Sequence, residues 1–396
     1  MPDFDVDQID HLLSTTRAVR KRLDLERPVP DEVLLRMIDL AEQAPSGGND
    51  TSRRWIVVRD PGQKRKLAEI YREAGLETLQ GLRDRTSGDS QNARNFNSAL
   101  YLAENLERVP ALVLSTIYGQ HDGSGRPGLF DSVIQSAWSF CLAARARGIG
   151  TAWTTIHLER AEDVAKALDI PAGVSQVVLF PVAYVTNPTF KPAPRRPADE
   201  ITYFDHWGLT FAPPAQAAHP GEGRGVSVEI DISASADQLW PIISDITTSS
   251  RCGSELQSAE WKPGHEPGLG SSFHGTNSGT DLGHPIIDAK VVELTGGVTW
   301  TTECHVVEWE PGRVFSYTVG DPDQPAARWT FRLYPMMNGT TRVTHSMRML
   351  SGMSGTSLVT QEKPKQAEEV LTGRLLKVRE NIQRTLAGIK DTAQGH

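Results

Sequence analysis

The sequence has little cysteine, no excess of positive charge and no long hydrophobic run. Its 396 residues include three cysteines, Cys141, Cys252 and Cys304, and no CxxC pair, which argues against a disulfide framework and a thiolate metal site. The net charge of -8 argues against nucleic acid or an anionic membrane as a partner, because both need a basic surface. The longest apolar stretches, around 110–117 and 177–185, are much shorter than a membrane span.

The N-terminal residues also lack the pattern of a leader. They are acidic and contain neither a basic region nor an apolar core, so we expect a soluble protein of the cytoplasm. Hydrophobic residues (38%) and charged residues (23%) occur in proportions that allow a packed core. A chain of 396 residues is longer than one ordinary domain, and we expect two.

A change of pattern near residue 209 divides the chain. Residues 209–225 are rich in Pro, Ala and Gly and have no periodicity, which is typical of a linker. Helical patterns alternate with short apolar strands before this segment, whereas alternating strands dominate after it until a final helix. We therefore predict one domain over 1–208, a linker over 209–225 and a second domain over 226–390.

Hydrophobic spacing predicts the main elements of the first domain. A stripe that begins after Pro30 indicates a helix, and residues 131–147 form a largely apolar helix that suits a contact between subunits. Gly148 follows this helix as a left-handed cap. Buried strands are predicted at 55–58, 110–117 and 175–185.

The second domain reads as an antiparallel sheet covered by one helix. Apolar residues alternate with polar ones over 226–232, and Glu310–Arg313 and Asn338–Gly339 are hairpin signals. Leu371 and Leu375 begin a spacing of four, three and four residues that continues to Ile382. This spacing predicts a C-terminal helix that covers the apolar face of the sheet.

Four segments of the first half have residues suited to an anionic, flat ligand. Arg17 and Arg20 are three residues apart, so on a helix both would meet one anion; the alternative is a solvated basic surface. Ala44–Asn49 lets backbone amides approach a ligand, or is an ordinary turn after a helix. Arg195 and Arg196 add positive charge, or belong to a basic linker.

The fourth segment, Gly148–Trp153, contains the pattern Gly-x-Gly-x-x-Trp. Its glycines follow a predicted helix and enter a strand, which is the reverse of the order in a dinucleotide-binding motif. A Rossmann site is therefore excluded, and a helix cap followed by a close backbone approach describes the segment better.

Together these segments resemble the nitroreductase family of FMN oxidoreductases over about residues 12–208. The resemblance rests on Thr16–Arg20, on the Ala-Pro-Ser-x-x-Asn loop at Ala44–Asn49, on Gly148–Trp153 and on Arg195-Arg196-Pro197. It implies an FMN site at the interface of an intertwined homodimer. The departures from the family pattern are Thr16, Ala18, Thr51 and Arg53, which remove side-chain hydrogen bonds worth about 1 kcal/mol each.

The resemblance also implies roles for individual residues. Arg17, with Arg195 or Arg196, would hold the FMN phosphate, and Arg20 would lie near the pyrimidine edge of the flavin, where negative charge collects on reduction. The remaining residues of the expected cofactor site are Ala18, Pro45, Ser46, Asn49, Thr51, Gly148 and Gly150. No catalytic side chain is expected, because the flavin performs the chemistry.

The second half, about residues 226–386, resembles the START-related SRPBCC, or polyketide-cyclase, family. The matching stretches are Ile232–Trp240, Pro267–Phe273, Arg328–Leu333 and Asn338–Val343. The resemblance implies a helix-grip fold with a cavity for an apolar or aromatic ligand. The expected fold class is thus α+β: a nitroreductase-like α/β sandwich, then a helix-grip antiparallel sheet with a long C-terminal helix.

Histidines of the second half show no metal-binding spacing. No HxH or HExxH pattern occurs among His265, His274, His284, His305 and His345, and no metal is predicted. A His–acid pair acting in an aldol-type cyclase is an alternative that the sequence does not place in one pocket.

The leading hypothesis is an FMN-dependent oxidoreductase that passes hydride from NAD(P)H through flavin to an electron-poor organic acceptor, such as a nitroaromatic, a quinone or an enone. The fused domain would hold an apolar substrate near the flavin. Two alternatives stay open: a flavin-dependent dehydrogenase or oxygenase of the same fold, and a non-catalytic ligand-binding protein with a degenerate flavin site.

Overall fold

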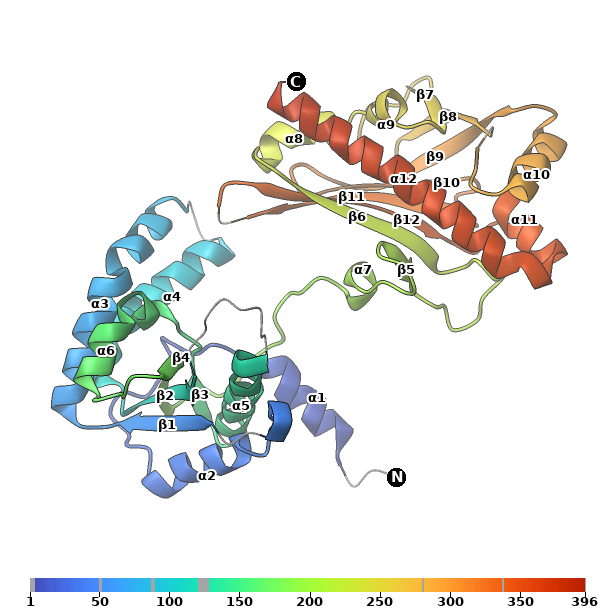
Figure 1. The fold of residues 1–396 in the computed structure, drawn as a ribbon. Coiled ribbons are helices and arrows are strands. Elements are labelled where there is room, and N and C mark those ends of the chain that lie inside the picture. The colour runs from blue at the N-terminus through green and yellow to red at the C-terminus, as the bar shows by residue number, and fades with distance from the viewer. Residues whose placement is uncertain are drawn as a thin grey trace. The chain divides into compact units, whose positions relative to one another are not determined.

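The computed structural model describes residues 4–49, 52–86, 90–119, 128–279, 281–336 and 338–395. It divides the chain into two compact units, Met1–Pro194 and Arg195–His396, each with its own sheet (Figure 1). The elements of the first unit are α1 (Val6–Thr15), α2 (Asp31–Ala41), η1 (Gly47–Asn49), β1 (Arg53–Val58), α3 (Pro61–Asp84), α4 (Gln91–Asn105), η2 (Leu106–Arg108), β2 (Ala111–Tyr118), α5 (Gly128–Arg145), β3 (Ile149–Thr151), η3 (Ile156–Arg160), α6 (Ala161–Ala167) and β4 (Val174–Tyr184).

The first unit is a three-layer sandwich around an antiparallel sheet of order β1-β2-β4-β3. Successive side chains of a strand point to opposite faces, and β2 is buried on both. Leu112 and Leu114 pack with Tyr71 of α3 and with the buried apolar side chains of α4. Val113 packs on the other face with Phe140 of α5 and with α2. Burial on two faces explains why the sequence of this strand is an unbroken apolar run.

The basic segment near the N-terminus differs from the sequence prediction. α1 ends one residue before Thr16, which already has extended backbone angles (φ -69°, ψ 122°). Ala18 forms an isolated parallel bridge with Thr151 of β3. The expectation that Arg17 and Arg20 share one face of a helix is therefore wrong, because this spacing brings side chains together only on helical backbone.

The second unit contains the other described elements. They are α7 (Ala198–Ile201), β5 (Leu209–Phe211), β6 (Arg224–Ile232), α8 (Ala236–Ile243), α9 (Thr248–Cys252), β7 (Leu256–Trp261), β8 (Ser272–Ser278), α10 (Pro285–Thr295), β9 (Thr299–Glu310), β10 (Val314–Val319), β11 (Ala327–Pro335), β12 (Thr341–Met349), α11 (Gly355–Glu362), η4 (Pro364–Gln366) and α12 (Ala367–Gln394).

A long helix lies across an antiparallel sheet in this unit, as the sequence predicts (Figure 1). The sheet has the order β5-β6-β12-β11-β10-β9-β8-β7, and each pair of neighbouring strands is antiparallel. The predicted apolar face of α12 is buried against it, from Leu371 and Leu375 to Val378 and Ile382. Both predicted hairpins occur, one between β9 and β10 and one between β11 and β12.

The boundary between the units differs from the predicted linker. The second unit begins at Arg195, and β5, which lies inside the predicted linker 209–225, pairs Leu209 with Val226 of β6. Arg196 forms an ion pair with Glu229 of β6 at 2.7 Å. A strand of three residues is held by backbone hydrogen bonds, so the hydrophobic pattern of the sequence gives no sign of it.

Candidate functional site

Three arginines of the first unit converge on the segment Phe190–Lys191, and we call them the basic cluster: Arg17, Arg22 and Arg145. The guanidinium carbons of Arg22 and Arg145 lie 4.0 and 4.8 Å from the centre of the Phe190 ring. Arg17 donates a hydrogen bond to the carbonyl of Lys191 at 2.9 Å. The sequence groups Arg17 and Arg22 among basic residues that suit one phosphate, whereas nothing in the sequence points to Arg145.

The basic cluster has a surplus of positive charge. Burial lowers the pKa of Arg145, and the charge of Arg22 lowers it further. The Nε atom of Arg145 is buried and has no hydrogen-bond partner in the part of the chain that the structure describes. Within the described residues, no carboxylate forms an ion pair with Arg17, Arg22 or Arg145. A cluster of this kind suits an anionic group such as a phosphate, because buried charge is stable when it is paired.

Arg20 lies apart from the basic cluster, between β3 and two helices. It donates to Ser98 Oγ of α4 at 3.3 Å, and its charge interacts with the hydroxyl of Tyr71 in α3. Burial lowers the pKa of Arg20. Burial also raises the pKa of Tyr71, whose hydroxyl shares a hydrogen bond of 2.7 Å with Thr154 Oγ1. Arg20 thus has no carboxylate partner among the described residues.

The predicted loop after α2 has a defined conformation. Gly48 and Asn49 both have positive φ angles, 64° and 56°, in the left-handed region that favours glycine and tolerates asparagine. The backbone amide of Gly47 donates to Ser132 Oγ of α5 at 2.9 Å. Pro45 and Ser46 precede this turn, and Thr51, also predicted for the cofactor site, lies outside the described residues.

A buried arginine fixes this loop. Arg53 is 8% exposed and donates to the carbonyl oxygen of Ala44 at 3.2 and 3.1 Å through its two terminal nitrogens. Its Nε lies 3.2 Å from a carboxylate oxygen of Glu42, whose other oxygen accepts from Trp55 Nε1 at 2.8 Å. The departure from the family pattern at Arg53 therefore has a structural role, which no spacing in the sequence indicates.

The two predicted glycines have different roles. Gly148 has a φ of 68°, the left-handed conformation predicted for it, but α5 ends at Arg145 and not at the predicted residue 147, so Gly148 closes a turn after the helix. Gly150 lies so close to its neighbours that an added Cβ would be 2.7 Å from Val185 Cγ1 and 3.0 Å from Val19 Cβ. The backbone amide of Val19 donates to the carbonyl of Thr151 at 2.8 Å. Gly150 thus allows the segment of Arg17, Ala18 and Arg20 to lie against β3.

Arg195 and Arg196 are the first two residues of the second unit. Arg196 forms its ion pair with Glu229, and its guanidinium lies 5.0 Å from the ring centre of Tyr334. Among the predicted cofactor residues, Arg17, Ala18, Arg20 and Gly150 lie together at the edge of the first unit that β3 forms.

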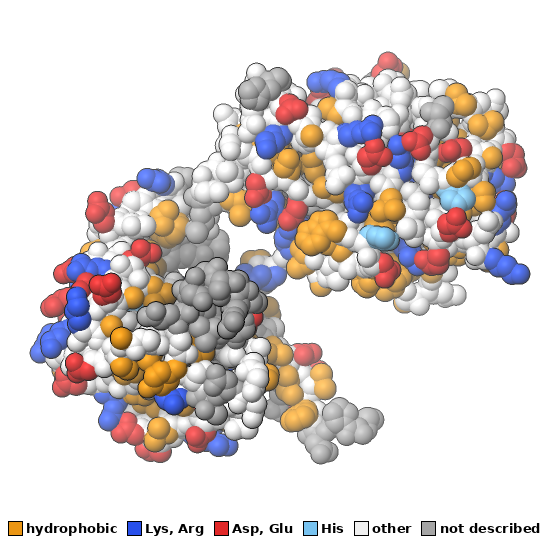
Figure 2. Space-filling view, in the orientation of Figure 1, with side chains coloured by type: hydrophobic (Ala, Val, Ile, Leu, Met, Phe, Trp, Pro, Cys, Tyr) orange, Lys and Arg blue, Asp and Glu red, His pale blue; other side chains and the backbone are white. Residues whose placement is uncertain are grey.

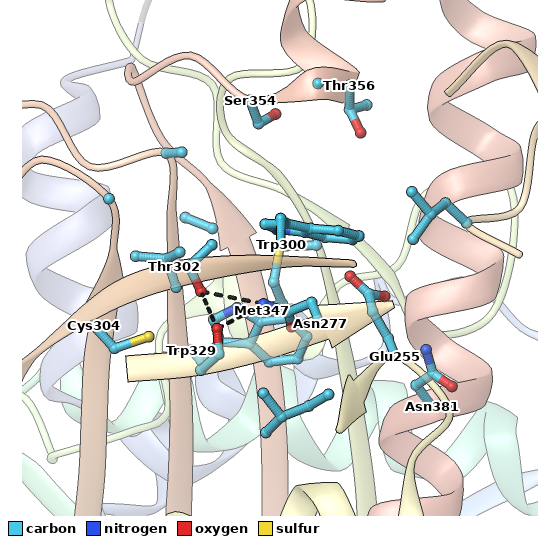
Figure 3. A pocket seen from close by; sticks show the side chains of 18 of the residues that line it. Glu255, Asn277, Trp300, Thr302, Cys304, Trp329, Met347, Ser354, Thr356 and Asn381 are labelled. Atoms are coloured by element: carbon cyan, nitrogen blue, oxygen red, sulfur yellow. Dashed lines mark hydrogen bonds between the residues drawn. The ribbon is translucent and has the colours of Figure 1, made fainter. Parts of the chain in front are cut away.

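A second candidate site is a cavity of about 410 Å³ in the second unit. It lies between the sheet, α10 and α12, and Ser354 before α11 and Thr356 in the first turn of α11 lie on the side opposite Trp329 (Figure 3). Its walls are mostly apolar and rich in aromatic and methionine side chains, including Trp300 and Met347. A cavity of this size and composition is typical of a binding site for a small apolar molecule.

A few polar groups interrupt the apolar wall. Arg374 of α12 forms two hydrogen bonds with the carboxylate of Glu255, at 2.8 and 2.6 Å. Asn381 lies beside Glu255 (Figure 3). Burial raises the pKa of Cys304 to about 12, so this thiol is not a nucleophile at neutral pH.

Among the histidines considered from the sequence, His345 lines the cavity. It is 2% exposed, its ring stacks on Phe331 at 3.7 Å, and neither ring nitrogen has a hydrogen-bond partner among the described residues. Burial lowers the pKa of His345 to about 3, so the ring is neutral at physiological pH. His305 lies elsewhere on the sheet, where its Nδ1 shares a hydrogen bond with Ser272 Oγ.

The described residues provide neither a metal-binding cluster nor a membrane-spanning helix. No group of three or more His, Cys, Asp or Glu side chains in the described segments has an arrangement that would hold a metal ion. Among the helices of the described segments, none is long and apolar enough to cross a membrane.

Each of these two sites lies in a region that matches a known family. Residues 13–184 match the Nitroreductase family, and residues 224–393 match the family described as polyketide cyclase/dehydrase and lipid transport. The chain joins a nitroreductase domain to a polyketide cyclase domain. This confirms both resemblances that the sequence motifs indicate, and with them the predicted fold class.

Relatives of the nitroreductase domain have different activities. Iodotyrosine deiodinase 1 of Rattus norvegicus is 28% identical over 199 residues, which are 48% of this chain and 67% of that protein. The 5,6-dimethylbenzimidazole synthase of Rhodospirillum rubrum is 28% identical over 176 residues, 42% of this chain and 76% of that protein.

Solved structures also match the first half of the chain. The crystal structure of oxidized iodotyrosine deiodinase bound to FMN and 3-iodo-L-tyrosine has 20% sequence identity and a TM-score of 0.39, and covers 50% of this chain and 98% of that one. A nitroreductase with bound FMN from Desulfitobacterium hafniense has 22% identity and a TM-score of 0.36, and covers 49% of this chain and 97% of that one.

Proposed function

We propose that the nitroreductase domain binds FMN and uses it to reduce a small, electron-poor organic molecule with electrons from NAD(P)H. The observation that carries the proposal is the surplus of positive charge at one edge of the domain. Arg17, Arg22, Arg145 and Arg20 all lack a carboxylate partner among the described residues, and one nitrogen of Arg145 is buried without any partner. FMN supplies both a phosphate and a pyrimidine edge that such groups bind.

The residues of this edge fit the two ends of the cofactor. In the proposed site, the basic cluster holds the phosphate, and Arg20 donates to the pyrimidine edge of the flavin. Gly150 lets the segment of Arg17, Ala18 and Arg20 pack against β3, which a larger residue would prevent because its Cβ would meet Val185 and Val19. Bound FMN would supply the two-electron chemistry, and the protein side chains would bind it, orient it and exclude water.

The family membership supports a flavin-dependent oxidoreductase type of function, and relatives with bound FMN agree with it. Those relatives include a deiodinase and a 5,6-dimethylbenzimidazole synthase, so nitro reduction itself is one candidate among several reactions. In our proposal the polyketide cyclase domain binds the apolar substrate or product, because its cavity of about 410 Å³ has mostly apolar walls.

We further propose that the nitroreductase domain forms a homodimer through α1 and α5. These two helices contact each other, and Arg145 of α5 donates to Thr15 Oγ1 of α1 at 3.3 Å. Leu13 of α1 and Trp138 of α5 are 48% and 44% exposed. Hydrophobic side chains are visible along α1 in Figure 2. A second copy of the domain would remove these surfaces from water.

Titration of the FMN-free protein with FMN tests the proposal. Replacing Arg17 or Arg20 by Ala removes a charge-assisted hydrogen bond, so each variant is expected to bind FMN about 10- to 100-fold more weakly. Arg59→Ala is the matched control, because Arg59 is exposed and pairs with Asp31 at 2.6 Å. FMN affinity unchanged by both site variants, or a wild-type protein that does not bind FMN, would contradict the proposal.

A further inference from the structure

The arginines of the basic cluster are held by neutral groups in the part of the chain that the structure describes. Arg22 donates to the carbonyl oxygens of Asn187 and Thr189 at 3.3 and 2.9 Å. Arg145 donates to the hydroxyl of Thr15 at 3.3 Å. The third arginine of the cluster also donates to a backbone carbonyl. Carbonyl and hydroxyl oxygens orient a guanidinium group but do not cancel its charge, so the cluster keeps its positive charge for a ligand.

Two of these arginines share the ring of Phe190. The guanidinium carbons of Arg22 and Arg145 lie over this ring, 4.0 and 4.8 Å from its centre. The two groups repel each other, and the charge of Arg22 contributes to the lowered pKa of Arg145. The face of an aromatic ring is electrically negative and attracts cations, so Phe190 offsets this repulsion without adding a charge of its own.

The position of the Phe190 ring is itself fixed by packing. Phe190 is 8% exposed and belongs to the apolar core that α3 and α4 form with the sheet. Its neighbours along the chain, Thr189 and Lys191, provide two of the carbonyl oxygens that accept from the arginines. An anion that enters such a site meets cations already in place and displaces no carboxylate. Preorganisation of this kind strengthens the binding of a charged group and adds little for an uncharged one.

We propose that Phe190 is a positioning residue that holds Arg22 and Arg145 for the phosphate of FMN and thereby sets the preference of the site for FMN over riboflavin. This inference rests on the proposed function, and it adds the residue that controls recognition of the phosphorylated cofactor. Phe190 acts through the two arginines. A residue that only filled the core would affect the binding of both flavins equally, because riboflavin has the same ring system and differs from FMN in lacking the phosphate.

Titration of the FMN-free, full-length protein with FMN and with riboflavin tests the inference, and flavin fluorescence reports binding. The quantity of interest is the ratio of the two dissociation constants. Phe190→Leu removes the ring and keeps an apolar side chain in the core. We expect this variant to lower the preference for FMN by about five- to twentyfold, the value of two partly buried cation–ring contacts, and to bind riboflavin as the wild type does.

Phe96→Leu is the matched control. Phe96 of α4 is also 8% exposed and lies in the same apolar core, and none of the cation–ring contacts among the described residues involves it. The control should therefore keep the wild-type preference for FMN. Phe190→Met provides a second test, because its flexible side chain fills the space of the ring without a π face, and we expect the same loss of preference.

The results separate this inference from the proposed function. An unchanged preference for FMN in both Phe190 variants, or an equal loss in Phe96→Leu, overturns the inference alone. Weakening of both flavins by the same factor in the Phe190 variants also overturns it, because the ring would then only support the fold. A wild-type protein that binds FMN and riboflavin equally well overturns the phosphate role of the basic cluster together with the inference. A wild-type protein that binds neither flavin contradicts the proposed function itself.

Discussion

Replacing Glu255 by Gln tests whether the buried ion pair neutralises the cavity. The change keeps the shape of the side chain and one acceptor for Arg374, but it removes the charge that balances the guanidinium. Loss of one partner of a fully buried pair costs about 3–5 kcal/mol of unfolding free energy. The side chains of Glu255 and Arg374 are still 17% and 15% exposed, so we expect the unfolding free energy to fall by the smaller amount of about 2–3 kcal/mol.

The double variant Glu255→Gln/Arg374→Met provides the control for this prediction. It leaves no charge to compensate, so the second unit should recover to within about 1 kcal/mol of the wild type. Hydrogen exchange of peptides from α12 and β9, followed by mass spectrometry, reports the stability of the second unit within the intact chain. A single variant that loses less than about 1 kcal/mol, or a double variant as unstable as the single one, would refute the reasoning.

Two further predictions concern single positions. Gly150→Ala places a Cβ 2.7 Å from Val185 Cγ1, so we expect the unfolding free energy of the first unit to fall by about 1–3 kcal/mol and FMN binding to weaken. Gly81→Ala is the control, because no atom lies within 4 Å of its added Cβ and the variant should lose no stability. Equal hydrogen-exchange protection of the first unit in both variants would contradict this prediction. Burial lowers the pKa of His345 to about 3 in the folded state, whereas an exposed histidine has a pKa of about 6.5. As the pH falls below about 6.5, the unfolded chain therefore gains this proton and the folded chain does not. The unfolding free energy of the second unit should fall by about 2 kcal/mol between pH 6.5 and pH 5 through this residue. His345→Phe should remove that part of the pH dependence, measured by calorimetric unfolding, and an unchanged slope would show that the ring is not the cause.

The sequence predicts the elements whose patterns are set by burial on one or two faces. The spacing of Leu371, Leu375 and Ile382 follows the helical period, and α12 buries all three against the sheet. The same spacing argument fails for Arg17 and Arg20, because charged residues three apart indicate a shared face only where the backbone is helical, and the helix ends before them.

Contacts between distant segments account for most of what the sequence does not predict. Arg145 belongs to a helix that reads as apolar, and its relation to Phe190 arises from the tertiary fold. Arg53 reads as a departure from a motif until its hydrogen bonds to Ala44 are seen.

The visible absorbance spectrum of the purified protein, with chromatographic identification of any released cofactor, tests the central claim most directly. The account predicts a yellow protein that releases FMN and whose flavin absorbance is bleached anaerobically by NADH or NADPH. A colourless protein that does not take up added FMN would contradict the assignment of a flavin site to the first unit.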